Sequence, residues 1–286
     1  MNHKQTMLKA AVNGFYSMQS TRIKVGNAVV GNFKSKIGQE PSKSEDTLDA
    51  DAKLLLSNLR TSYKNITDGI VSMTPRKFKK DGLIDAYSEF SLVQQYVNLV
   101  DAEDTAFKQI EYSVKEFPIW KSFLEDVKGV GPTMAAVIIA SFDIHKAEYP
   151  SSLWAYAGLD VVNGAGRSRK KEHLVEQTYI DKDGKEQTKK GISFNPFLKT
   201  KLIGVLGGSF VKTNGVYRDI YDNYKHRITN MPAHAEKTKA HLNNMAIRYT
   251  VKRFLVDLYS AWRKLEGLPV AEEYSKAKLG IDHKVA

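Results

Sequence analysis

Two glycines that flank a single valine, immediately before a proline, form the segment whose residue types most clearly suit a chemical role. The segment is Gly129-Val130-Gly131-Pro132, and apolar residues at helical spacing lie on both sides of it. Glycine permits a tight turn, and proline is favoured in the first turn of a helix. Bare N–H groups at a helix N-terminus attract anions such as a DNA phosphate. We therefore predict a helix-hairpin-helix whose amides at Gly129, Val130 and Gly131 hold phosphate, with a plain helical hairpin as the alternative.

A glycine-rich loop further along the chain gathers four cations around one serine, Ser168. These cations are Arg167, Arg169, Lys170 and Lys171. The composition suits contact with the phosphates of a nucleic acid. Residues 174–180 and 185–190 then alternate on either side of an Asp-Gly turn, which predicts a β-hairpin with a basic rim.

Two predicted helices nearer the C-terminus add further cations. One is expected to carry Lys199 and Lys201 facing away from its apolar residues. The other is expected over residues 237–262, where Arg248 and Lys252 fall on a stripe beside the apolar face. Such a stripe would line a groove for a polyanion. The alternative is a charged helix edge whose aliphatic stems pack on the core.

The overall composition favours a polyanionic partner. The 43 Lys and Arg residues against 32 Asp and Glu give a formal net charge of +11, and the sequence pI is about 9.4. Both ends of the chain are basic and the middle is near neutral, which makes nucleic acid the first candidate. A further short basic run, residues 74–80, suits a phosphate contact and a solvated loop equally well.

Several classes of site are excluded by residue types and motifs. The sequence has no cysteine, which excludes disulfide scaffolds, thiolate zinc sites, iron–sulfur clusters and cysteine nucleophiles. The acidic residues within 45–51 are interpreted as first-turn residues that match a helix dipole. Neither a P-loop nor a dinucleotide fingerprint is present, so we expect no cofactor. The scattered histidines lack the i, i+4 spacing of a zinc helix, so we expect no metal. Without a long apolar run or a signal peptide, we expect a cytoplasmic protein with no membrane partner.

The elements that must position these residues are mainly helices. Residues 1–117 predict a helical N-terminal region, and residues 118–286 a helix-hairpin-helix domain that carries the small β-hairpin. Helical spacing of apolar residues also predicts one helix from Leu55 to Ile70 and a long one over Ile84–Val114. Asp104 falls on the apolar stripe of the long helix. That stripe predicts packing in a bundle or against a second copy of the chain, as in a homodimer.

Three segments, taken in order, resemble one known family. They are Lys128–Ala136, Trp154–Leu159 and Gly191–Asn195, and over about residues 119–212 the chain resembles the C-terminal domain of a bacterial insertion-sequence transposase family. Enzymes of this family pair an N-terminal RuvC-like acidic domain with a serine-bearing C-terminal domain, and some are guided by a bridge RNA. The chain as a whole looks like stand-alone bacterial and phage relatives of these transposases. The resemblance implies that residues 118–286 form a domain of this C-terminal type.

The resemblance also implies which of the family's catalytic features to expect. A RuvC-like domain would open with a strand bearing an early aspartate that helps to hold Mg²⁺, whereas the first acidic residue here is Glu40. We therefore expect the RuvC-like nuclease half to be absent. The family's serine nucleophile stands before a glycine, at a position occupied here by Ala165 or Gly166, and Ser168 would be its displaced equivalent. The alternative is that Ser168 donates a hydrogen bond to a phosphate.

Three functions remain open at this point. The first is a DNA-binding protein related to transposases or recombinases, which holds duplex or branched DNA through the helix-hairpin-helix and the basic loop. The second is an enzyme, a recombinase in which Ser168 forms a covalent serine–DNA intermediate. The third is an RNA-binding module, because basic and aromatic surfaces do not distinguish DNA from RNA.

Overall fold

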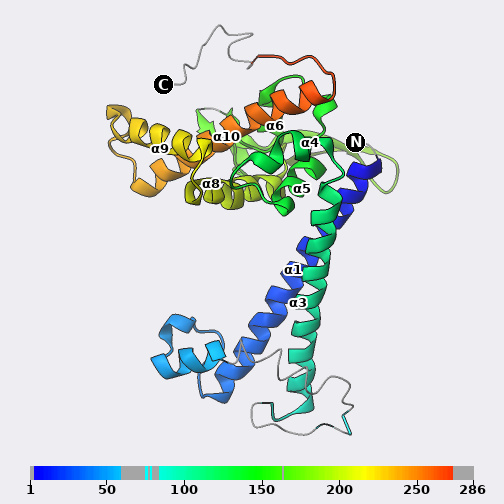
Figure 1. Ribbon diagram of the computed structural model, residues 1–286, viewed down its shortest axis with the longest axis vertical. Helices are drawn as coiled ribbons and strands as arrows, with labels where there is room; N and C mark the ends of the chain where they lie inside the picture. Colours follow the sequence, from blue (N-terminus) through cyan, green and yellow to red (C-terminus); the bar gives the residue numbers. More distant parts are fainter. Residues whose placement is uncertain (1–2, 59–74, 77, 79–83, 163, 273–286) are drawn as a thin grey trace. The chain divides into compact units, whose positions relative to one another are not determined.

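The computed structural model describes most of the 286 residues of the chain (Figure 1). The residues it describes are 3–58, 75–76, 78, 84–162 and 164–272. They are mainly helical, as predicted, and their strands form two small antiparallel sheets. The chain divides into two compact units, which are described separately below. The smaller unit is Ala10–Gln109, and the larger unit combines Met1–Lys9 with Ile110–Ala286.

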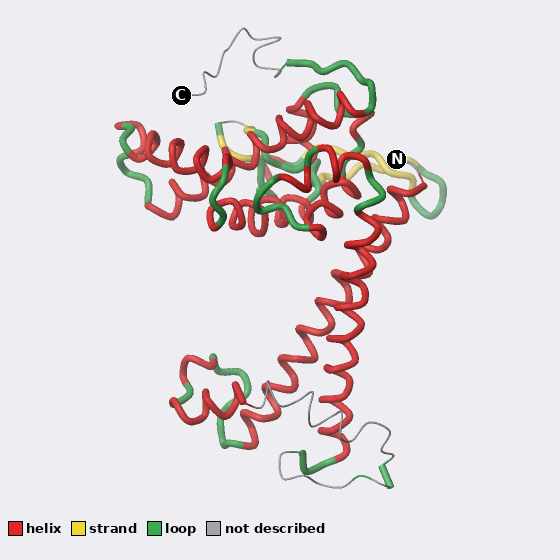
Figure 2. The backbone as a smooth tube through the Cα atoms, in the orientation of Figure 1, coloured by secondary structure: helices red, strands yellow, loops and turns green. Residues whose placement is uncertain are grey.

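Two long helices form the frame of the smaller unit, where they lie side by side (Figure 2). They are α1 (His3–Lys36) and α3 (Tyr87–Val114). The rings of Phe15 and Phe107 approach to 6.5 Å between centroids, and an ion pair between Arg22 and Glu103 joins the same two helices. The predicted long helix is therefore present, and it begins three residues later than the predicted start at Ile84.

An apolar cluster is buried where these two helices meet the segment that follows α1. Its buried members are Val29, Phe33, Leu48, Leu56, Ile84, Phe90 and Val93. That segment includes the 3₁₀ turn η1 (Glu45–Thr47) and a helix whose described residues are 50–58. Most of the predicted helix from Leu55 to Ile70, and most of the basic run 74–80, lie outside the described residues.

The predicted apolar stripe of α3 is only partly correct. Phe90, Val93 and Val114 of the predicted stripe are buried, whereas Val100 and Phe107 are 36% and 38% exposed. Asp104 is also exposed, and its carboxylate lies 2.7 Å from Lys108 one helical turn away. The prediction that Asp104 lies on the buried stripe was wrong. A straight helix has 3.6 residues per turn, so positions seven residues apart do not stay on quite the same face. Along a long helix, the buried face therefore turns away from positions that a seven-residue repeat would align.

The larger unit contains a series of shorter helices. Its α-helices are α4 (Pro118–Ser122), α5 (Pro132–Ser141), α6 (Pro150–Tyr156), α7 (Pro196–Thr200), α8 (Gly208–Lys212), α9 (Val216–Thr229) and α10 (Lys239–Leu265). Its 3₁₀ turns are η2 (Leu124–Asp126), η3 (Ile144–Lys146), η4 (Lys171–His173) and η6 (Pro232–His234). Proline opens α4, α5, α6 and α7, where its missing N–H costs no helical hydrogen bond. Within the described ranges, no helix combines the length and apolarity that a membrane span requires.

Helix α5 is an apolar helix inside the larger unit. Every residue from Met134 to Ala140 is buried, as expected of a helix with neighbours on all sides. The first residues of the chain bind the C-terminal end of α5. There the side-chain amide of Gln5 donates to the carbonyls of Ile139 and Phe142, at 2.7 Å each.

The strands of the larger unit form two hairpins. They are β1 (Val161–Val162) paired with β2 (Ala165–Gly166), and β3 (Val175–Ile180) paired with β4 (Glu186–Gly191). In the turn between β3 and β4, Asp181 Oδ1 accepts the N–H groups of Asp183 and Lys185 at 3.0 and 2.9 Å. Gly184 follows with a φ of +76°, which favours glycine. The predicted Asp-Gly hairpin is therefore confirmed.

A continuous helical segment follows the second hairpin. It consists of α7, the π-helical segment η5 (Lys201–Gly207) and α8. Gly207 faces α10 so closely that a Cβ there would lie 2.4 Å from a methyl group of Ile247. The absence of a side chain at Gly207 thus allows the two helices to approach each other. Three residues earlier, Gly204 faces open space.

We expect Gly207→Ala to lower the free energy of unfolding by about 1–3 kcal/mol, because the added methyl group would overlap Ile247. Gly204→Ala is the matched control in the same segment. It is expected to raise the free energy of unfolding by up to about 1 kcal/mol, because alanine reduces the entropy of the unfolded chain. Urea denaturation followed by circular dichroism measures both effects. Equal effects of the two substitutions would contradict the close approach of this segment to α10.

Candidate nucleic-acid interface

The glycine turn joins two helical segments of the larger unit. It follows α4 and η2, and the helix after it begins at the predicted residue, Pro132. Gly129 has a φ of +100°, and a Cβ there would lie 3.1 Å from the ring of Phe210. Gly131 is the N-cap of α5, with a φ of −90° and nothing within 4 Å of an added Cβ. The first glycine is therefore required by conformation and packing, and the second leaves open space in front of α5.

The backbone N–H groups of this turn differ in their availability. The N–H of Val130 donates to the carbonyl of Val127 at 3.0 Å, so it already has a partner inside the protein. The N–H groups of Gly131, Thr133 and Met134 have no acceptor in the described part of the chain. The donors available to an anion therefore lie in the first turn of α5 rather than at Val130.

Three of the predicted cations meet around one carboxylate, that of Asp160. Arg167 Nε lies 2.8 Å from both oxygens of Asp160, and Nη2 lies 2.7 Å from Oδ2. Arg248, from α10, donates to the carbonyls of residues 158–160 at distances of 2.9 to 3.3 Å. Lys199, from α7, donates to the carbonyl of Arg167. We call Asp160, Arg167, Lys199 and Arg248 the cationic cluster.

The cationic cluster carries excess positive charge, because it contains three cations and one carboxylate. Burial lowers the pKa of Lys199, and the charges of Arg248 and Arg167 lower it further, against the opposing effect of Asp160. Burial likewise lowers the pKa of Arg248. In contrast, the hydrogen bonds to Asp160 raise the pKa of Arg167. An anion bound beside Lys199 would compensate the excess positive charge.

The other predicted cations lie in different surroundings. Arg169, Lys170 and Lys171 are exposed on the loop that follows β2, and Lys170 Nζ lies 3.7 Å from Glu172. Lys201 and Lys252 lie over aromatic rings, with Nζ 5.5 Å from the centroid of Phe197 and 4.0 Å from that of Trp154 respectively. Burial also lowers the pKa of Lys201.

Ser168 contacts a buried histidine that sequence reasoning did not identify. Ser168 Oγ lies 2.9 Å from His173 Nδ1, and the same nitrogen accepts the main-chain N–H of Ser168 at 2.9 Å. Because Nδ1 accepts this N–H, we assign the ring proton to Nε2. Nε2 is buried without a hydrogen-bond partner among the described residues, and a carboxylate oxygen of Glu172 lies 3.8 Å away. The 3₁₀ turn η4 brings His173 back to Ser168, and no regular spacing in the sequence indicates this contact.

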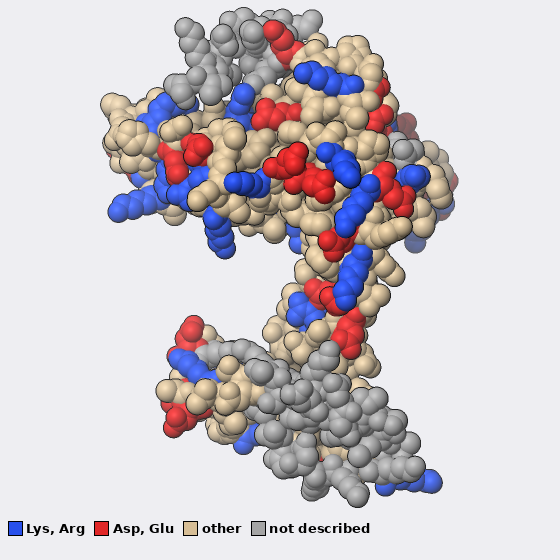
Figure 3. Space-filling view, viewed as in Figure 1, with Lys and Arg blue, Asp and Glu red and all other residues tan. Residues whose placement is uncertain are grey.

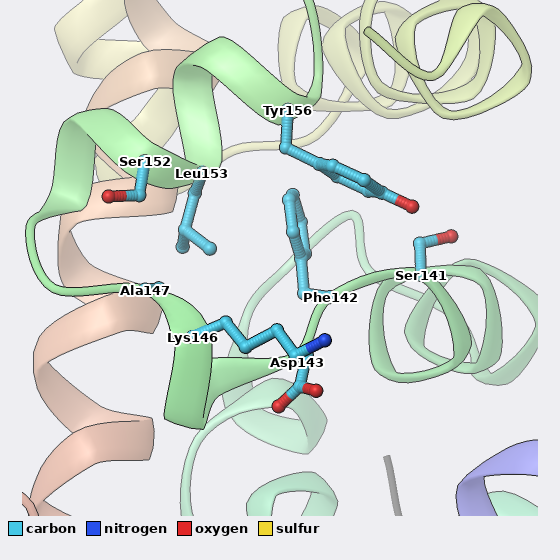
Figure 4. A pocket seen from close by; sticks show the side chains of 8 residues that line it. All are labelled: Ser141, Phe142, Asp143, Lys146, Ala147, Ser152, Leu153 and Tyr156. Carbon is cyan, nitrogen blue, oxygen red and sulfur yellow. The ribbon is translucent and has the colours of Figure 1, made fainter. Parts of the chain in front are cut away.

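A cavity of about 390 Å³ lies beside the C-terminal end of α5 (Figure 4). The rings of Phe142 and Tyr156 form part of its wall, with centroids 5.9 Å apart. The hydroxyls of Tyr156 and Ser141 lie on one side of the cavity, and Lys146 and Asp143 lie on another. None of the cations predicted to bind nucleic acid lines this cavity, so it is separate from the candidate interface. No cluster of three or more potential metal ligands is found among the described residues.

Comparison with protein families gives a match that covers part of these features. Residues 121–178 match the model of the transposase IS116/IS110/IS902 family. The matched segment contains the glycine turn, Ser168 and the exposed cations of the loop, and the match supports a transposase-family relationship. No match was found among curated proteins.

We expect the replacement of Lys199 by methionine to change the pH dependence of stability in a defined direction. The pKa of Lys199 is lowered in the folded protein, so between that value and the unfolded value the unfolded chain binds more protons. The contribution of Lys199 to stability therefore rises as pH increases through this window. We compare the unfolding free energies of wild type and Lys199→Met across alkaline pH. As pH rises, the difference between them should shift in favour of the wild type. A constant or falling difference would contradict the burial of a charged Lys199 among other cations.

Proposed function

We propose that this protein is a DNA-binding protein related to transposases or recombinases, and that its larger unit holds duplex or branched DNA. The observation that carries the proposal is the cationic cluster, in which three partly buried cations lie near one carboxylate. Arg167 binds the carboxylate of Asp160, whereas Lys199 and Arg248 bind main-chain carbonyls. Excess buried charge is costly unless it meets a counter-charge. A phosphate of a DNA backbone is the counter-charge that the family match of residues 121–178 makes most relevant.

In this proposal the cations have two separate tasks. Arg167 and Arg248 hold the loop through their hydrogen bonds to Asp160 and to the carbonyls of residues 158–160. A phosphate beside Lys199 would compensate the excess charge of the cationic cluster. The exposed Arg169, Lys170 and Lys171 extend from that loop and contact phosphates. Such contacts position a duplex without reading its sequence.

The glycine turn supplies a second phosphate contact in the proposal. Gly129 has the positive φ, and Gly131 has the open space that a helix-hairpin-helix needs to bring a backbone amide against a phosphate. The N–H groups of Gly131, Thr133 and Met134 are the proposed donors. The predicted RNA partner, the homodimer formed through α3 and the cytoplasmic location stay predictions. For the homodimer, the exposed Val100 and Phe107 are the apolar residues available.

We expect the double substitution Arg169→Ala with Lys171→Ala to weaken duplex binding and to reduce the salt dependence of the affinity. Two lost phosphate contacts should change the slope of log affinity against log salt by about 2. Fluorescence anisotropy at several salt concentrations measures this slope. Lys9→Ala with Lys24→Ala is the control, because it removes the same charge from exposed positions on α1.

An unchanged slope in the loop variant, or an equal change in the α1 variant, would argue against the loop as a DNA-binding surface. Competition with a four-way junction and with structured RNA completes the measurement. If RNA displaces duplex DNA efficiently and the junction does not, the RNA-binding alternative replaces the DNA assignment.

A second candidate function is favoured by the contact between Ser168 and His173. Ser168 Oγ would attack the phosphorus of a DNA phosphodiester while its proton passes to His173 Nδ1, 2.9 Å away. The serine–phosphorus bond forms as one phosphorus–oxygen ester bond breaks. The leaving alcohol takes the proton from His173 Nδ1, and the DNA end stays covalently attached to the serine through its phosphate. The neighbouring cations would stabilise the charge on the phosphate during this step.

We expect this reaction to leave a covalent adduct with DNA that depends on Ser168. Incubation with labelled duplex and junction DNA, followed by denaturing electrophoresis, should show an adduct for wild type and none for Ser168→Ala. Ser193→Ala is the matched control, because Ser193 Oγ accepts a hydrogen bond from Arg167 at 2.7 Å and contacts no histidine among the described residues. A wild-type protein that binds these DNAs and forms no adduct would remove this second function for those substrates.

A further inference from the structure

A groove between α9 and α10 combines aromatic rings with positive charge. It has a volume of about 560 Å³, within the range of small-ligand sites. Its lining includes Asn223, Tyr224 and Arg227 from α9, and Tyr249 and Arg253 from α10. The two helices are neighbours in the larger unit (Figure 1). None of these residues belongs to the cationic cluster or to the glycine turn.

Two tyrosines form the aromatic part of the groove. The rings of Tyr224 and Tyr249 are stacked, with centroids 3.9 Å apart and planes inclined by 10°. The guanidinium carbon of Arg227 lies 5.0 Å from the centroid of Tyr224. Both rings are partly exposed, and burial raises the pKa of Tyr224. The guanidinium of Arg227 and the two tyrosine rings thus form a column with flat surfaces. Another planar group can stack on such a surface.

The polar residues of the groove fit a nucleotide better than they fit an apolar ligand. Arg227 and Arg253 supply positive charge, and no carboxylate is found among the described residues that line the groove. The side chain of Asn223 is exposed and can donate to or accept from a base edge. Lys and Arg side chains also lie over α8 and α9 on the face shown in Figure 3.

We propose that this groove binds an unpaired nucleotide of a DNA strand. The base stacks on the column of Tyr224 and Tyr249, and the adjoining phosphates lie beside Arg227 and Arg253. A base within a duplex has both faces covered by its neighbours, so stacking on a tyrosine selects nucleotides that are single-stranded or displaced. The inference rests on the proposed function and deepens it, because it assigns the unpaired part of a branched DNA to a site of its own.

The test compares a blunt duplex with the same duplex carrying a short single-stranded extension that contains 2-aminopurine. For the wild type we expect affinity for the extended duplex to exceed that for the blunt duplex by about tenfold, because base stacking on aromatic residues contributes at this scale. Binding should also quench 2-aminopurine fluorescence. Tyr249→Leu should abolish both the preference and the quenching while affinity for the blunt duplex is retained. Tyr112→Leu is the control, since Tyr112 is 74% exposed on α3.

A second variant serves if Tyr249→Leu disturbs folding. If Tyr249→Leu lowers the thermal unfolding temperature strongly, Arg227→Gln replaces it, because Arg227 is exposed and its loss should spare the α9–α10 packing. Retention of the preference and of the quenching in a folded Tyr249→Leu or Arg227→Gln variant would overturn the inference. A wild type that binds both DNAs equally, without quenching, would overturn it and leave the proposed function intact. A wild type that binds neither DNA would overturn the proposed function, and a marked preference for an RNA extension would overturn the assignment to DNA.

Discussion

Three hydrogen bonds from Arg248 to the carbonyls of residues 158–160 fix the loop on which the candidate interface depends. A guanidinium presents its N–H groups in one plane and can therefore bind consecutive carbonyls of a turn. With Asp160 held in place, its carboxylate binds Arg167, and the carbonyl of Arg167 accepts Lys199. Arg248 thus ties α10 to the turn after α6, and Asp160, Arg167 and Lys199 extend this connection to α7.

This arrangement disfavours the charge of one of its own residues. Burial and neighbouring charges lower the pKa of Lys199, which means that its charged form is disfavoured at that position. A cluster selected for stability alone would pair each cation with a carboxylate or would contain apolar residues. An anionic ligand would explain the excess positive charge, because its binding would offset the repulsion between the cations.

The loop also sets the environment of Ser168, so two functional interpretations depend on one piece of backbone. His173 Nδ1 accepts the main-chain N–H of Ser168 and lies equally close to its hydroxyl. The contact therefore stabilises the loop whether or not the serine reacts. The two interpretations are physically compatible, because cations that bind a phosphate also stabilise negative charge on it during attack. The groove between α9 and α10 differs in its chemistry, since stacked rings suit exposed bases rather than a duplex backbone.

The sequence by itself determined the features that depend on residues adjacent in the chain. These include the helix start at Pro132, the Asp-Gly hairpin and the collection of cations around Ser168. It did not indicate that Arg248 turns toward a distant loop, that His173 returns to the serine, or that tyrosines of two helices stack. Periodicity identifies the face of a helix but not what that face meets. Only the tertiary structure therefore decided which cations bind within the protein and which stay exposed.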